Sequence, residues 1–205
     1  MIAHSTPLLE YAVVSVPMKG EAESGDLHLV KNTPRGALVA VVDGSGHGSE
    51  AASAAQLAVS TLEAHANEGV IPLVRQCHTR LRRTRGAVMS LVAFDGIDNT
   101  ITWLGVGNIE GLLLRCSALT RDPDAVIFLQ PGVVGYRLPQ LQAAVTPIMP
   151  GDLLILTTDG IRGDFARAFS LDDQPSKIAE YISSNFPKGN DDVLVLVARY
   201  LGQKQ

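Results

Sequence analysis

Aspartates occur at the ends of apolar runs in this sequence, next to glycine or another small residue. Asp43 follows the apolar run 37–42 and precedes Gly44, and Asp159 follows a second apolar run and precedes Gly160. Aspartates also stand just before apolar runs, at Asp26, Asp191 and Asp192. An unpaired carboxylate is costly to bury at the end of a core strand. These positions are therefore candidates for holding a ligand.

The chemistry of such a site depends on whether the strand ends converge. Converging carboxylates repel one another strongly unless cations lie between them. Oxygen ligands without a nearby Cys or His cluster favour Mg²⁺ or Mn²⁺ over zinc. Two such ions about 4 Å apart would generate a bridging hydroxide and clamp a phosphoryl group for in-line attack. The alternative is that each Asp-Gly pair is only a turn, which is our expectation for Asp95-Gly96 between two strands.

The elements that must position these aspartates are mainly strands joined by short turns, and short turns favour antiparallel neighbours. Helical patterns cover 49–65, with Ser49 as the expected N-cap, 72–84, with Pro72 in the first turn, and about 175–185. Apolar runs predict strands over 9–16, 27–31, 37–42, 87–94, 100–106, 110–116, 126–130, 152–158 and 193–200. Many strands with segregated helices predict an α+β fold, an antiparallel β-sandwich flanked by helices.

Composition narrows the class of protein. The chain has 205 residues, of which 46% are hydrophobic, which predicts one domain over residues 1–205. A net charge of −4 argues against nucleic acid or an anionic membrane as a partner. The N-terminus lacks the pattern of a signal peptide, and Cys77 and Cys116 form no CxxC motif. We therefore expect a cytoplasmic protein with two unpaired thiols.

Several segments, in their order along the chain, resemble the motifs of a known enzyme family. They are Gly25-Asp26, VVDGSGHGSEAA from position 41, LTTDGI from position 156 and GNDDVLVLV from position 189. This series is similar to that of the PPM-type metal-dependent serine/threonine protein phosphatases, in particular their SpoIIE-like branch. RGAVMSLVAF, WLGVGNIEGLLL and PGVVGYRLP resemble segments of the small stressosome phosphatases within that branch. The resemblance covers nearly the whole chain and implies the PPM fold, a β-sandwich flanked by helices.

The resemblance also implies a site with two Mn²⁺ or Mg²⁺ ions. Its central ligand would be Asp43, which would bridge both ions. The Gly44 carbonyl and Asp26 would bind one ion, and Asp159 and Asp191 would bind the other. Asp43 and Asp159 are the residues expected to be essential for catalysis.

Other positions receive weaker roles or none. Asp192 would support the adjacent ligand without binding a metal itself. Many family members have histidine where this chain has Ser45, and we assign no catalytic role to His47. The family's N-terminal phosphate-binding arginine has no clear counterpart here, and Gly163 stands where a third metal site would need an acid.

The predicted function is that of a phosphoserine/phosphothreonine protein phosphatase. By resemblance, its substrates would be phosphorylated STAS-domain proteins of a stressosome, and their dephosphorylation would reset stress signalling. The alternative is a catalytically weak module that keeps the fold and binds a phosphoprotein. The presence of every predicted aspartate ligand favours the enzyme.

A cluster of arginines has two possible interpretations. It lies on and after the second predicted helix, at Arg75, Arg80, Arg82, Arg83 and Arg85. It is either a solvated face or a docking patch for an acidic protein surface.

Overall fold

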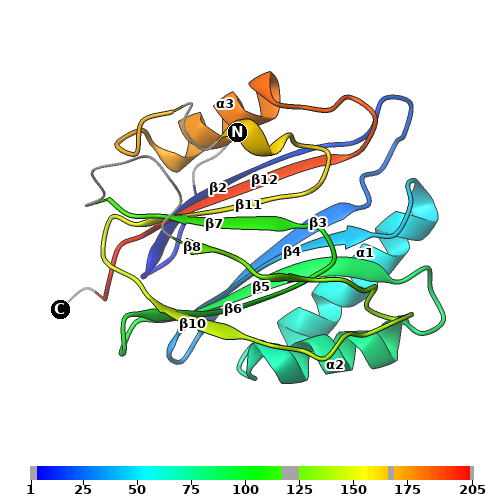
Figure 1. The fold of residues 1–205 in the computed structure, drawn as a ribbon, viewed down its shortest axis with the longest axis horizontal. Helices are drawn as coiled ribbons and strands as arrows, with labels where there is room; N and C mark the ends of the chain where they lie inside the picture. The colour runs from blue at the N-terminus through cyan, green and yellow to red at the C-terminus, as the bar shows by residue number, and fades with distance from the viewer. Residues whose placement is uncertain (1–3, 117–124, 166–168, 204–205) are drawn as a thin grey trace.

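Two β-sheets lie face to face in the computed structural model, which describes residues 4–116, 125–165 and 169–203 (Figure 1). The first sheet has the order β1 (His4–Ser5), β2 (Leu9–Val16), β12 (Val193–Tyr200), β11 (Leu153–Thr157), β7 (Glu110–Leu114), β8 (Ala125–Val126). The second has the order β10 (Ala144–Pro147), β6 (Thr100–Val106), β5 (Ala87–Asp95), β4 (Gly36–Gly44), β3 (Asp26–Thr33), and β9 (Leu129–Gln130) pairs with β6. Except for the parallel β6–β9 pair, all these pairs are antiparallel.

Helices cover both outer faces of the sandwich. The helices α1 (Ser49–Ala64) and α2 (Val70–Leu81) pack on the second sheet, and α3 (Pro175–Asn185) packs on the first (Figure 1). A 3₁₀ turn, η1 (Gly163–Phe165), follows β11. The predicted sandwich flanked by helices is therefore confirmed.

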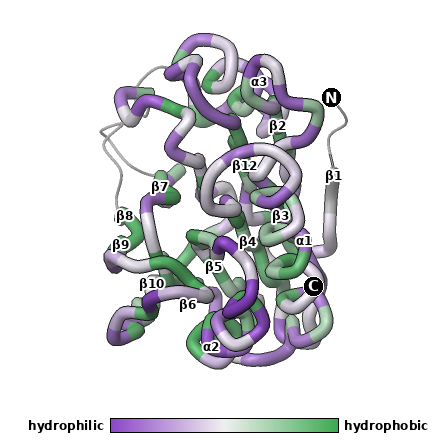
Figure 2. The backbone as a smooth tube through the Cα atoms, turned by 90° about the vertical axis from the view of Figure 1, so that its right-hand side faces the viewer, coloured by the Kyte–Doolittle hydropathy of each residue, from purple (hydrophilic) through white to green (hydrophobic). Residues whose placement is uncertain are grey.

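Three apolar layers hold these elements together. One lies between the two sheets, a second lies under α1 and α2, and a third lies under α3. The tube view shows apolar residues on the central strands and hydrophilic residues in many of the surrounding loops (Figure 2). The strand β4 is buried on both faces because it lies between β3 and β5 and is covered by α1 on one side and by the first sheet on the other. The strand therefore holds its last residues, Asp43 and Gly44, in a fixed position.

The helix α1 packs closely because its buried face consists mainly of small side chains, including Ala51, Ala54, Ala55 and Ala58. Its N-cap is Gly48, at φ 74°, and not Ser49 as expected; no side chain caps the helix. This left-handed conformation favours glycine, so the backbone geometry of the preceding loop decides where the helix begins.

Several predicted boundaries differ from the structure. The predicted strand 126–130 is wrong as one element, because the chain crosses between sheets there and forms β8 in one and β9 in the other. The side chain of Phe128, between them, is exposed. The strand β7 ends at Leu114, and the N–H of Cys116 turns to the Asp152 carboxylate, at 3.0 Å. The strands β1 and β10 are absent from the prediction.

The second predicted helix also begins earlier than expected. Because α2 starts at Val70, Pro72 is its third residue, where a missing N–H costs no intrahelical hydrogen bond. Both Cys77 and Cys116 are free thiols, as predicted. Within the described parts of the chain, no helix combines the length and apolarity that crossing a bilayer requires.

The tight packing of α1 leads to a prediction. Ala55→Leu adds bulk to a fully buried position on that helix and should lower the free energy of unfolding by about 1–3 kcal/mol. Gln56→Leu, at the adjacent exposed position, is the control and should change it by less than about 0.5 kcal/mol. Urea denaturation measures both values, and equal effects would show that α1 does not pack as described.

Candidate metal centre

Two aspartates face each other where β3 begins and β4 ends. Asp26 and Asp43 are direct partners in the antiparallel β3–β4 pair, so their side chains project to the same face of the second sheet. Val39 and Val41 alternate along β4 with Asp43 and pack in the layer between the sheets. Both carboxylates therefore point into the end of the sandwich.

The first sheet contributes polar residues at the same end. Thr158 and Asp159 follow β11, and Asp191 and Asp192 precede β12, its antiparallel neighbour. The hydroxyl of Thr158 donates to the Asp26 carboxylate at 2.7 Å and accepts from the Leu194 N–H at 2.9 Å. A buried hydrogen bond thus joins the ends of the two sheets.

Asp192 fixes the connection between β2 and β3. The residue is 3% exposed, and its carboxylate accepts from the backbone N–H groups of Met18 and Gly25, each at 2.7 Å. The Gly25 carbonyl in turn accepts from the Gly44 N–H at 3.0 Å. Asp192 therefore supports the residues around Asp26 and Asp43 through the backbone.

Glycine is required beside two of the aspartates for steric reasons. A Cβ at Gly44 would overlap the carbonyl of Ala51, in the first turn of α1. A Cβ at Gly160 would overlap the carbonyl of Asp192. The glycines after Asp43 and Asp159 therefore allow other backbone segments to approach the site closely, and they are not simply turn residues. The Asp95-Gly96 pair is a turn, as predicted, because the Asp95 carboxylate accepts from the N–H groups of Ile97 and Asp98.

The electrostatics of the cluster are unfavourable to ionised carboxylates. Burial, as the larger cause, and repulsion from the other aspartates raise the pKa of Asp43 to about 8. Burial likewise raises the pKa of Asp26 to about 7, even though the hydrogen bond from Thr158 opposes the shift. Burial and repulsion from Asp191 raise the pKa of Asp159. The predicted aspartates therefore converge closely enough to interact.

The side chains themselves engage neighbouring donors. Asp159 accepts from the Asn108 amide at 2.7 Å, and Asp191, which is exposed, accepts from the Asp192 N–H at 2.9 Å. Within the residues that the structure describes, no three His, Cys, Asp or Glu side chains are arranged to hold one metal ion as they stand. The donor set nonetheless consists of carboxylate oxygens and the Gly44 carbonyl, which suits a hard divalent cation. Simultaneous ligation would require some of these side chains to move closer to one another.

Two residues of this centre were not identified from the sequence. In the sequence, Thr158 is the second of two threonines before Asp159. Leu154 and Leu156 alternate with it along the chain and pack between the sheets, so this alternation could have shown that Thr158 also faces inwards. Asn108 lies in the turn between β6 and β7. It contacts Asp159, which is 51 residues further along the sequence. No local pattern could have indicated such a contact.

The weaker candidates lie outside the cluster. The His47 ring is exposed and its Nδ1 lies 2.8 Å from the Glu21 carboxylate, so its contact is with the β2–β3 loop. Asp164, near Gly163, is exposed and lies 3.7 Å from the Arg162 guanidinium. Among the described residues, neither forms a hydrogen bond or an ion pair with the converging aspartates.

The raised pKa values predict how the stability of the metal-free protein depends on pH. Folded Asp26 and Asp43 retain protons that the unfolded chain releases above about pH 4. The free energy of unfolding should therefore fall as pH rises from about 4 to about 8. Urea denaturation in EDTA at pH 5.5 and pH 8 tests this, and Asp43→Asn should be the more stable protein at pH 8. A wild-type stability that rises over this interval would contradict the described repulsion.

Comparisons with known proteins agree with this geometry. The chain is 23% identical over 184 residues to the phosphoserine phosphatase RsbX of Bacillus subtilis (strain 168), covering 86% of this chain and 89% of that protein. A solved structure from work on the bacterial stressosome, described as a modular system adapted to control secondary messenger signalling, is 32% identical. Its TM-score is 0.83, with 93% of this chain and 99% of that chain covered.

Two metal-containing structures share the fold. The crystal structure of RsbX in complex with magnesium has a TM-score of 0.84 at 19% identity and covers 97% of this chain and 98% of that one. The second structure is the catalytic domain of the serine/threonine protein phosphatase PstP in complex with 2 manganese ions. It has a TM-score of 0.70 at 20% identity, and the match covers 95% of this chain and 99% of that one. These similarities confirm the PPM-type sandwich.

The family itself follows from a match to most of the chain. The family model described as Stage II sporulation protein E (SpoIIE) matches residues 33–201, a segment that includes β4 with Asp43 and continues past the end of β12. This match confirms the resemblance inferred from the order of the aspartate motifs. The chain belongs to the SpoIIE family of PPM-type phosphatases.

Proposed function

We propose that this protein is a divalent-metal-dependent phosphatase for phosphoserine and phosphothreonine in proteins. The observation that carries the proposal is the convergence of carboxylates from both sheets at one end of the sandwich, with raised pKa values, in a SpoIIE-family chain. Such repulsion is costly for a fold to keep unless cations relieve it in the working protein. The ligands in this proposal are Asp26, Asp43, the Gly44 carbonyl, Asp159 and Asp191.

The choice of Mn²⁺ or Mg²⁺ rests on the oxygen-only donor set. The magnesium found with RsbX and the 2 manganese ions found with PstP support the same choice. Bound cations would supply a water-derived nucleophile and neutralise the negative charge of the phosphoryl group.

The residues of this chain have distinct tasks in the proposal. Asp43 is at the centre because its carboxylate interacts with all the other aspartates of the cluster. Thr158 orients Asp26, and Asn108 orients Asp159, through hydrogen bonds of 2.7 Å each. His47 is not assigned to proton transfer, because its ring is hydrogen-bonded to the Glu21 carboxylate.

The proposed natural substrate is a phosphorylated STAS-domain protein of a stressosome. Support comes from the similarity to RsbX, which is named a phosphoserine phosphatase, and to a chain from stressosome work. The substrate would present a phosphorylated side chain to the site at the end of the sandwich. Dephosphorylation would then return the stressosome to its resting state.

Hydrolysis of p-nitrophenyl phosphate tests the activity. Turnover should require Mn²⁺ or Mg²⁺ and stop in EDTA, and Asp43→Asn or Asp159→Asn should lower it at least about 100-fold. Asp172→Asn, at an exposed position after η1, is the matched control and should keep wild-type turnover. A wild-type protein that binds a phosphoprotein but hydrolyses no phosphorylated substrate in any metal would instead be a phosphoprotein-binding module.

Thermal unfolding tests metal binding without turnover. A ligand that binds only the folded state stabilises it, and Mn²⁺ at about 100 times its Kd should raise the Tm by about 5–10 °C. Asp43→Asn should reduce this increase the most among the ligand variants, because Asp43 is shared by both ions in the proposal. Identical melting curves in Mn²⁺ and EDTA would rule out the metal site.

A further inference from the structure

A cavity of about 710 Å³ adjoins the aspartate cluster on the side of the β2–β3 loop. Asp26, one of the proposed ligands, is among the residues that line it. Its lining includes the half-buried side chains of Leu27 and Leu57 and the exposed side chains of Glu23 and Gln56. Its volume is in the range of ligand-binding clefts, and its lining combines apolar and polar groups as such clefts do.

A second cavity, of about 390 Å³, lies on the other side of the first turns of α1. It is lined by Ser49, Glu50 and Ser53 of α1 and by residues 83–85 of the connection between α2 and β5. Ser53 lines both cavities. The two therefore flank Ser53 on the exposed face of α1, and we refer to them together as the α1 groove.

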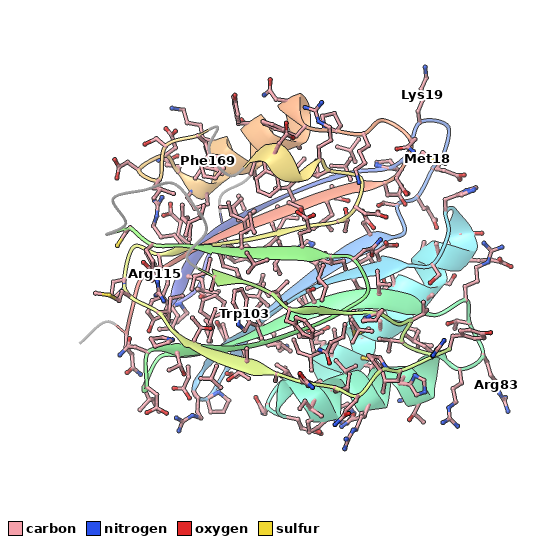
Figure 3. The ribbon with its side chains drawn as sticks, in the orientation of Figure 1. Met18, Lys19, Arg83, Trp103, Arg115 and Phe169 are labelled. Carbon is pink, nitrogen blue, oxygen red and sulfur yellow. The ribbon has the colours of Figure 1, made fainter. Side chains whose placement is uncertain are left out.

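The two ends of the α1 groove carry opposite charges. The acidic end has Glu23, an exposed carboxylate in the β2–β3 loop. The other end has Arg85, which forms an ion pair with Glu50, and Arg83, which forms no ion pair with any residue in the described parts of the chain. Arg83 extends away from the body of the protein at the same end of the sandwich as Met18 and Lys19 of the β2–β3 loop (Figure 3). Arg83 is thus available to a partner.

We propose that the α1 groove binds the substrate polypeptide on both sides of its phosphorylated residue. This inference rests on the proposed phosphatase function and adds a basis for its choice of substrate. Every phosphoprotein offers the same phosphate, so the aspartate cluster alone cannot distinguish substrates. The groove can, because it favours a basic residue beside Glu23 on one flank and an acidic residue beside Arg83 on the other. Leu27 and Leu57 add an apolar surface for one intervening side chain.

Phosphopeptides with a single charged flank test the polarity of the groove. The series places Lys or Glu on the N-terminal or the C-terminal side of phosphoserine in a neutral background, and kcat/KM is measured with Mn²⁺. The wild-type protein should prefer Lys on one flank and Glu on the other, each by about twofold to fivefold. Glu23→Lys should reverse the first preference only, and Arg83→Glu should reverse the second only.

The result does not depend on the direction in which the peptide lies. Both variants should hydrolyse p-nitrophenyl phosphate at the wild-type rate, since that substrate has no flanking residues. Shifts on the same flank, or no shift in either variant, would overturn the proposal while leaving the phosphatase function intact. Absence of turnover of p-nitrophenyl phosphate in the wild-type protein would instead overturn the function on which the proposal rests.

Steric blocking provides a second test that does not depend on charge. Ser53→Tyr places a bulky side chain between the two cavities, and it should raise KM for the phosphopeptides several-fold without slowing p-nitrophenyl phosphate hydrolysis. Ser184→Tyr, at an exposed position of α3 on the opposite face of the sandwich, is the matched control. Equal KM values for the two variants would show that substrate does not occupy the α1 groove.

Discussion

Electrostatic repulsion among the aspartates at one end of the sandwich is the constraint on which the rest of the structure depends. Asp26 and Asp43 are brought together by strand register, and Asp192 is held opposite them by the first sheet. Burial removes the water that would otherwise screen these charges. The pKa values of Asp26 and Asp43 are consequently raised well above that of an exposed aspartate. A fold that keeps such an arrangement must hold these residues rigidly.

The rigidity comes from hydrogen bonds that cross between the sheets and from the packing beneath them. The Thr158–Asp26 and Gly25–Asp192 bonds tie β11 and β12 to the start of β3. The alanine-rich face of α1 lets that helix lie close to β3 and β4, and the missing side chain of Gly44 gives the helix room to approach. The same helix exposes Ser53 and Gln56 on the outside. One element thus supports the aspartate cluster and forms the base of the α1 groove.

Local patterns in the sequence predicted most of the fold and the members of the cluster. The strands 9–16, 100–106 and 193–200 have the predicted bounds, because continuous or alternating apolar residues end at clear turn signals. The aspartates could be identified because a charge at the end of a buried strand is unusual and because their order resembles a known family.

The features that were missed depend on tertiary contacts. Segment 126–130 has the composition of one strand, and only its position between the two sheets divides it. The contact between Asn108 and Asp159 and the inward orientation of Thr158 follow from how β7 and β11 pair and which way β11 faces. The groove on α1 combines loops that are distant in sequence, so neither its volume nor its opposite charges could be anticipated.

The central claim is that the converging carboxylates hold divalent cations. Anomalous scattering from crystals grown with MnCl₂ tests it most directly, because manganese can be located independently of any assumption about ligands. We expect two anomalous peaks about 4 Å apart with Asp43 between them, one beside Asp26 and the other beside Asp159 and Asp191. A map of fully occupied, well-ordered protein with no peak at Asp43 would contradict the account.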